Sequence, residues 1–300
     1  MTNETRGMLL GLAGVLMFSL TLPMTRIAVA ELDPLWLALA RAEGAAALAA
    51  IVLVATRQRW PSPREWRALA WVAAGVVLGF PLFSSIAMRT SEASHGAVIV
   101  GLLPLATAGF AAAFGSERPG RRFWAAAAIG SAVVAAFALR DGIGRIGTGD
   151  LSMLLAVLAG AIGYARGGEA AKALGGWQTI CWALLLAAPL LLAPTLWLTL
   201  RAPLATVSGG AWLGFAYVTV FSQFIGFFAW YGGMALGGVA RVSQVQLLQL
   251  FFTLVFAAWI AGESVGPLNW GVATLVVAIV AVARRAPVAA TLPLHRGSVP

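Results

Sequence analysis

Charged residues are scarce in this chain, and their scarcity excludes a water-soluble globular protein. They make up 10% of the 300 residues, whereas hydrophobic residues make up 60%. Soluble domains carry about 25% charged residues, because their surfaces need polar side chains that face water. The apolar residues also come in blocks of about twenty, the length that crosses about 30 Å of hydrocarbon. The composition therefore predicts an all-α membrane protein.

Cysteine and histidine, which supply many metal and catalytic sites, are almost absent. Cys181 is the single cysteine, so no intramolecular disulfide can form, and the two histidines are His95 and His295. The chain has no His/Cys metal spacing, no Walker-type glycine loop and no Ser-His-Asp set. We therefore expect no metal, no cofactor and no enzymatic activity.

Lysine is nearly absent too, and arginine carries the net charge of +9. All basic residues except Lys172 are arginines, and most stand in short clusters between apolar blocks. A nucleic-acid surface instead needs basic residues gathered on one face. Short clusters between spans are typical of the positive-inside rule. The expected partners are thus the lipid bilayer and a small-molecule substrate, with no nucleic acid, and the chain is expected to be a monomer or a weak homo-oligomer.

Glycine, proline and arginine clusters divide the chain into ten predicted transmembrane helices with short connections. The first apolar block is too long for a signal-peptide core and lacks a cleavage site, so we interpret it as a retained helix. The segment 286–300 is predicted to be a disordered cytoplasmic tail. The predicted helices span residues 7–30, 34–56, 66–88, 94–114, 122–139, 149–171, 176–200, 207–231, 238–261 and 266–284.

The basic residues between these helices predict the orientation. With the N-terminus inside, only four lie outside, namely Arg89, Arg140, Arg145 and Arg201. Fourteen then lie inside, namely Arg6, Arg57, Arg59, Arg64, Arg67, Arg118, Arg121, Arg122, Arg166, Lys172, Arg241, Arg284, Arg285 and Arg296. This bias predicts a multi-pass protein of the bacterial inner (plasma) membrane with both termini in the cytoplasm.

The two halves of the chain resemble each other. A shift of about 146 positions brings Gly14 onto Gly160, Phe18 onto Tyr164 and Arg26 onto Lys172. With five helices in each half, the second half must insert with the opposite orientation. We therefore predict two inverted five-helix repeats, residues 1–146 and 147–285, an architecture in which secondary transporters bind substrate between the halves.

Short motifs resemble the drug/metabolite transporter superfamily, in its ten-helix EamA-type branch. The stretches Leu102–Leu105 and Phe114–Glu117 resemble its "L-P-hydrophobic … G-E" signature, and Arg41 stands where the family often has an arginine. The equivalent second-half run, which includes Ser243, lacks the proline. Length and layout are similar to bacterial exporters of amino acids, including aromatic ones. The resemblance implies export by alternating access without ATP.

Three charged residues fall inside the first helical hairpin: Arg26, Arg41 and Glu43. All lie roughly 8–14 Å from the outer surface at 1.5 Å per residue, where an unpaired charge is costly. One interpretation is a structural ion pair between Glu43 and Arg26, with Arg41 snorkelling to the interface. The other is functional: an arginine that binds a carboxylate, or a proton-sensitive Glu43.

Polar and small residues mark helix faces that avoid lipid. Polar stripes run along 207–231 and 238–261, and they predict either packing contacts or a cavity. Glycine seams along 7–30 and 149–171 predict close static packing or, alternatively, moving gates. Glu117 and Glu263 end helices and are expected to contact the start of the next helix.

These features predict a secondary transporter that exports small neutral metabolites, in particular amino acids including aromatic ones. Aromatic walls would stack a flat side chain, and hydroxyl and amide groups would bind an amino-acid backbone. The alternatives are a multidrug or sugar-metabolite carrier, or a membrane scaffold protein without transport. The predicted substrate-binding residues are Phe18, Phe80, Ser84, His95, Tyr164, Ser222, Gln223, Trp230, Ser243 and Gln246.

Overall fold

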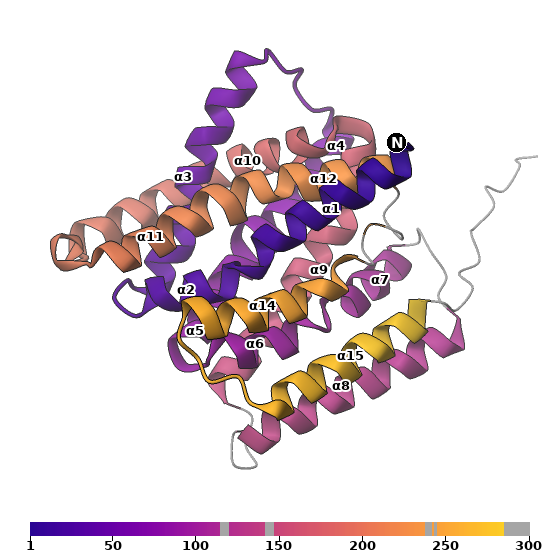
Figure 1. Ribbon diagram of the computed structural model, residues 1–300. Coiled ribbons are helices and arrows are strands. Elements are labelled where there is room, and N and C mark those ends of the chain that lie inside the picture. Colours follow the sequence, from indigo (N-terminus) through magenta and orange to yellow (C-terminus); the bar gives the residue numbers. More distant parts are fainter. Residues whose placement is uncertain (115–119, 142–146, 238–241, 243–244, 285–300) are drawn as a thin grey trace, which may run out of the picture.

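The computed structural model describes residues 1–114, 120–141, 147–237, 242 and 245–284, and regular structure in these ranges is entirely helical (Figure 1). The elements of the first half are α1 (Asn3–Ser19), α2 (Thr21–Val29), α3 (Pro34–Ala55), α4 (Pro63–Val72), η1 (Ala73–Gly79), α5 (Phe80–Thr90), α6 (Ala93–Val100), α7 (Leu103–Ala113) and α8 (Arg121–Asp141). Those of the second half are α9 (Thr148–Leu174), α10 (Gly176–Arg201), η2 (Leu204–Thr206), α11 (Gly209–Tyr217), η3 (Val218–Ile225), α12 (Gly226–Gly237), α14 (Leu247–Ile260) and α15 (Pro267–Arg284).

Joined end to end, these elements follow the predicted helices closely. Seven continuous segments are long and apolar enough to cross a membrane, and three shorter apolar helices accompany them in the described ranges. The prediction of an all-helical membrane protein is confirmed; that ten helices cross the bilayer stays a prediction. Figure 1 shows α8 and α15 side by side at one edge of the bundle.

Local sequence explains where several helices begin. The Asp33 carboxylate accepts a hydrogen bond from the Trp36 backbone N–H, and Pro34 follows as the first helical residue of α3. Ser62 and Glu65 form a capping box at the start of α4. Such caps satisfy backbone N–H groups that have no partner within the helix. The polar turn residues thus fix the boundaries that the apolar blocks only approximate.

Hydrogen bonds join the connections between helices in pairs, one pair at each end of the bundle. At one end, Glu31 accepts hydrogen bonds from the Ser208 hydroxyl and backbone N–H, which lower the pKa of its carboxyl below its usual value. At the other end, Gln178 donates to Gln58. The first pair falls on the predicted outer side and the second on the predicted cytoplasmic side. The four connections that make these contacts thus pair across the two halves as the predicted topology requires.

Two seams of glycine bring helices into backbone contact. In the first, Gly7, Gly11 and Gly14 of α1 face α12, which runs beside α1 in Figure 1. An added Cβ on Gly7 would lie 2.5 Å from the Gly237 nitrogen. In the second seam, an added Cβ on Gly75 of η1 would lie 2.7 Å from the Gly163 nitrogen of α9. Gly7 and Gly14 of α1 and Gly163 of α9 thus pack closely, each against a helix of the opposite half.

Candidate functional site

A small cavity lies at the centre of the bundle, between the two halves of the chain. Its volume is about 20 Å³, room for about one water molecule. It is lined by Phe18, Thr21, Arg41, Val76, Phe80, Tyr164, Ser222, Gln223, Phe227 and Gln249. We call this the central cavity. A solute as large as an amino acid can enter it only after the surrounding helices separate.

One side of the central cavity is polar and carries a positive charge. Arg41 of α3 is 1% exposed, and its Nη2 donates to the Ser222 hydroxyl of η3 at 3.0 Å. Ser222 also shares a hydrogen bond of 2.8 Å with Thr21 of α2. The guanidinium stays charged in proteins. Three helices therefore hold a cation and two hydroxyl groups against the cavity.

The other side of the central cavity is aromatic. The rings of Phe18 and Tyr164 stack with centroids 6.4 Å apart and planes inclined by 28°. Phe227 packs against both rings, with centroids 5.0 Å from Phe18 and 6.1 Å from Tyr164. The Trp230 ring packs against the same pair, with its centroid 6.2 Å from that of Phe18 and 5.6 Å from that of Tyr164. The two residues that the internal shift relates, Phe18 and Tyr164, thus meet in one cluster.

Two π-helical segments border the central cavity at equivalent places in the two halves. The segments are η1 and η3, and a shift of about 146 positions superimposes them. π-helical turns are rare and often stand at functional sites. η1 contributes Val76 to the lining, and η3 contributes Ser222 and Gln223. Both interruptions of regular helix thus fall where the lining residues lie.

Gln223 joins the two π-helical segments. Its Nε2 donates to the backbone carbonyls of Val76 at 3.1 Å and Val77 at 3.4 Å. Pro81 follows these residues by five and four positions and has no N–H, so it cannot donate to either carbonyl. The Gln223 amide supplies the missing donor from the other half of the chain. A side chain of η3 thus compensates for the proline that follows η1.

We expect Gln223→Met to destabilise the protein, because it leaves the Val76 and Val77 carbonyls buried without this donor. The expected loss in the free energy of unfolding is about 1–3 kcal/mol. The measurement is thermal unfolding of the purified variant in detergent. Gln178→Met is the matched control, since Gln178 donates at 3.3 Å in a part-buried position at the end of the bundle. Equal losses in both variants would contradict the role given to Gln223.

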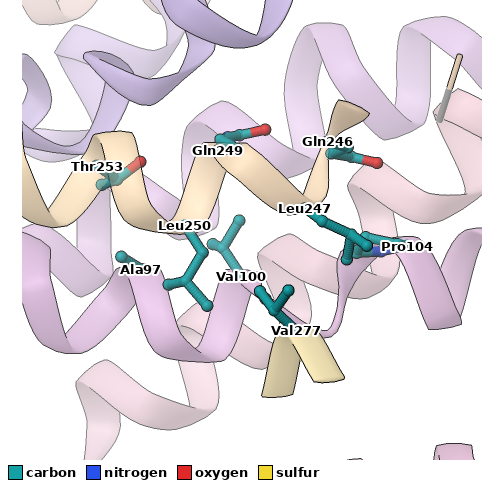
Figure 2. A pocket seen from close by; sticks show the side chains of 10 residues that line it. Ala97, Val100, Pro104, Gln246, Leu247, Gln249, Leu250, Thr253 and Val277 are labelled. Atoms are coloured by element: carbon teal, nitrogen blue, oxygen red, sulfur yellow. The ribbon is translucent and has the colours of Figure 1, made fainter. Parts of the chain in front are cut away.

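A second small cavity adjoins the central cavity along α14. Figure 2 shows Gln249 and Thr253 along one edge of α14 and Gln246 just before its start, while Leu250 points to the side on which Ala97 and Val100 of α6 lie. Gln249 lines both cavities. Among the described residues, the Gln249 Oε1 and both amide atoms of Gln246 are buried without hydrogen-bond partners. The described members of the polar stripe on 238–261, Gln246, Gln249 and Thr253, therefore line small internal spaces.

The ion pair proposed for the charged hairpin is wrong. Arg26 donates through Nη1 to the Met88 carbonyl at 2.6 Å, and the buried Glu43 Oε1 accepts no hydrogen bond from the described residues. The snorkelling of Arg41 is also wrong, because this side chain is buried and directed at Ser222. Arg26 and Arg41 lie on different faces of the hairpin, and each finds a partner on another helix.

Several predicted site residues lie away from the central cavity. His95 lies 2.6 Å from the Asp150 carboxylate and stacks on Phe137, in a separate space beside the start of α9. Ser84 is buried and donates to the Pro81 carbonyl. Gln246 lines only the second cavity. Ser243 lies outside the described residues.

The expectation for Glu263 also needs correction, while Glu117 lies outside the described residues. Glu263 accepts hydrogen bonds from the backbone N–H groups of Ala93 and Ser94, at 2.6 and 2.8 Å. It therefore caps the start of α6, far away in sequence, and not the start of α15. The N-terminal turn of a helix favours a negative charge, which accounts for this contact.

Four lining residues were missing from the predicted site: Thr21, Val76, Phe227 and Gln249. Helical spacing signals two of them, because Thr21 follows Phe18 by three positions and Phe227 follows Gln223 by four. Gln249 belonged to a recognised polar stripe. Val76 carries no such signal, since its exposure to the cavity depends on the π-helical turn.

The fold and the central cavity define a polytopic membrane protein with a small internal cavity between its two halves. Comparison with known proteins agrees. The model of the EamA-like transporter family matches the chain twice, over residues 5–139 and 147–285. The chain belongs to this family of the drug/metabolite transporter superfamily. Its relatives are transporters and not enzymes.

Individual relatives support the same assignment. The uncharacterized transporter YdeK of Bacillus subtilis is 44% identical over 95% of this chain and 99% of its own length. The uncharacterized transporter sll0355 of Synechocystis is 25% identical over 86% and 83%. One crystal structure matches with a TM-score of 0.64 at 17% identity, over 93% of this chain and 96% of that chain. This last similarity concerns the fold alone.

Proposed function

We propose that the protein exports small neutral metabolites, in the first place amino acids including aromatic ones, across the bacterial inner membrane by alternating access. The observation that supports this proposal most is the central cavity, in which the stacked rings of Phe18 and Tyr164 face hydroxyl and amide groups. Aromatic walls favour a flat apolar side chain, and the polar side orients a backbone.

The small volume of the central cavity supports the alternating-access part of the proposal. The cavity has space for about one water molecule, so an amino acid can bind there only in a conformation in which the helices stand further apart. Residues from both halves line it, so separation at either end would open it to one side of the membrane. The two glycine seams join helices of opposite halves and provide surfaces along which the halves can move.

The proposal predicts exchange of tryptophan and phenylalanine by the protein reconstituted in liposomes. Tyr164→Ala is expected to weaken this exchange roughly tenfold or more, because it removes one wall of the aromatic cluster. Phe251→Ala is the matched control, since Phe251 stacks on Trp270 away from the central cavity. The measurement is uptake of labelled amino acid into liposomes preloaded with the same amino acid.

Other solutes in the same assay distinguish the alternatives. Uptake of sugars or of large cationic drugs at the rate of phenylalanine would contradict the amino-acid assignment and favour a broader carrier. Equal loss of exchange in Tyr164→Ala and Phe251→Ala would show that the aromatic cluster acts through stability alone. Absence of uptake for every solute tested would favour a scaffold role.

A further inference from the structure

The buried guanidinium of Arg41 has donor groups without partners, and this is the observation that extends the proposed function. Its Nη2 bonds to Ser222, whereas Nε and Nη1 are buried with no hydrogen-bond partner among the described residues. No carboxylate in the described ranges lies within 4 Å to form an ion pair with it. A desolvated charge with unused donors is costly to maintain.

The surroundings of Arg41 favour an anion as the missing partner. The lining of the central cavity contains one cation, three hydroxyl groups (Thr21, Tyr164 and Ser222) and two amides, and it contains no acidic residue. A guanidinium binds carboxylates through charge-assisted hydrogen bonds, often with two parallel N–H donors. Once the helices separate, the aromatic side of the cavity would contact an apolar group of the same ligand. The site therefore matches an amphipathic molecule with a negative head.

We infer that the central cavity is a carboxylate site in which Arg41 binds the carboxylate of the transported solute. The ligand class is small monocarboxylates with an apolar or aromatic group, which includes amino acids. This inference rests on the proposed function and makes it more specific. Ser222 and Thr21 hold the guanidinium on the cavity side, and the partnerless Gln249 Oε1 is placed to accept a hydrogen bond from an α-ammonium group.

Competition by matched compounds against exchange of labelled tryptophan, and separately against exchange of labelled leucine, tests this inference on the wild-type protein. Tryptamine lacks the carboxylate of tryptophan, and indole-3-propionate keeps the carboxylate but lacks the amine. Leucine, isopentylamine and 4-methylpentanoate form the same series without an aromatic ring. Inhibition by both carboxylates of a series, with the amine roughly tenfold to hundredfold weaker, is expected for one bond to a charged group.

Variants then assign this preference to Arg41. Arg41→Gln is expected to lower carboxylate affinity by the same tenfold to hundredfold and to leave the amine unaffected, so the preference disappears. Arg41→Lys keeps the charge without the planar fork and should retain part of the preference. Arg26→Gln is the matched control: it removes the other arginine of the hairpin, outside the central cavity, and should keep the preference.

The possible outcomes separate this inference from the proposed function. If the leucine series shows the carboxylate preference and the tryptophan series does not bind, the aromatic assignment fails and the carboxylate site stands. If amines compete as well as carboxylates in the wild type, the carboxylate site is wrong even where amino acids are carried. The competition experiment uses the wild-type protein, so its result stands even if Arg41→Gln does not fold. Absence of binding by every carboxylate overturns both.

Discussion

Gly233→Ala is expected to prevent stable folding, with a loss of about 3 kcal/mol or more in the free energy of unfolding. An alanine Cβ at this position would lie 2.7 Å from the Gly7 carbonyl oxygen and 2.8 Å from the Gly11 nitrogen. Both are backbone atoms of α1, so neither can turn aside as a side chain would. The steric clash can be relieved only if α1 and α12 separate along this seam, which also carries Phe18 and Trp230.

The neighbouring residue supplies the control for this prediction. An added Cβ on Gly232 meets no atom within 4 Å, although it stands on the same turn of α12. Gly232→Ala is therefore expected to be neutral or stabilising by up to about 1 kcal/mol, from the higher helix propensity of alanine. Thermal unfolding in detergent and the yield of monodisperse protein measure both variants. Equal behaviour of the two would contradict the backbone contact between α1 and α12.

The second large effect is all-or-none and concerns orientation. On a Cys181→Ser background, a cysteine in place of Arg121 should react with a membrane-impermeant thiol reagent only from the cytoplasmic side. A cysteine in place of Thr206 should react only from outside. Arg121 and Thr206 are exposed in the structure, whereas Cys181 is buried. The physical reason is the concentration of arginine in the connections predicted to be cytoplasmic.

Intact cells and inside-out vesicles distinguish the two orientations. Reaction of the Arg121→Cys variant in intact cells, without permeabilisation, would reverse the proposed topology. Reaction of both variants from the same side would contradict the alternation of the helices between two ends of the bundle. The hydrogen bonds of Glu31 with Ser208 and of Gln58 with Gln178 support that alternation.

The class of protein and the approximate helix boundaries follow from the sequence alone. A bilayer requires about twenty apolar residues in every span and admits few charges, so both requirements are visible in the amino-acid sequence. The close helix contacts could also be predicted, because the glycines recur at helical spacing along 7–30 and 149–171. The pairing of Phe18 with Tyr164 follows the internal shift of about 146 positions.

The tertiary structure decided the roles of the charged and polar residues. Position along a helix placed Arg26, Arg41 and Glu43 at one depth, but depth does not specify direction. The packing of α3 against η3 turns Arg41 toward Ser222, whereas Arg26 reaches the carbonyl of Met88. His95 likewise joins Asp150, which stands 55 positions later in the chain. Such pairs depend on which helix faces which, and a one-dimensional pattern does not contain that choice.

The π-helical turns show the same division between sequence and tertiary structure. The presence of Pro81 in the sequence means that the carbonyls of Val76 and Val77 lose a helical hydrogen-bond donor, because proline has no N–H. The donor that replaces it is the amide of Gln223, on a helix of the other half. The proline thus determined which carbonyls lose a helical donor, and the folded chain decided which residue would replace that donor, because long-range hydrogen bonds form only once the helices are packed.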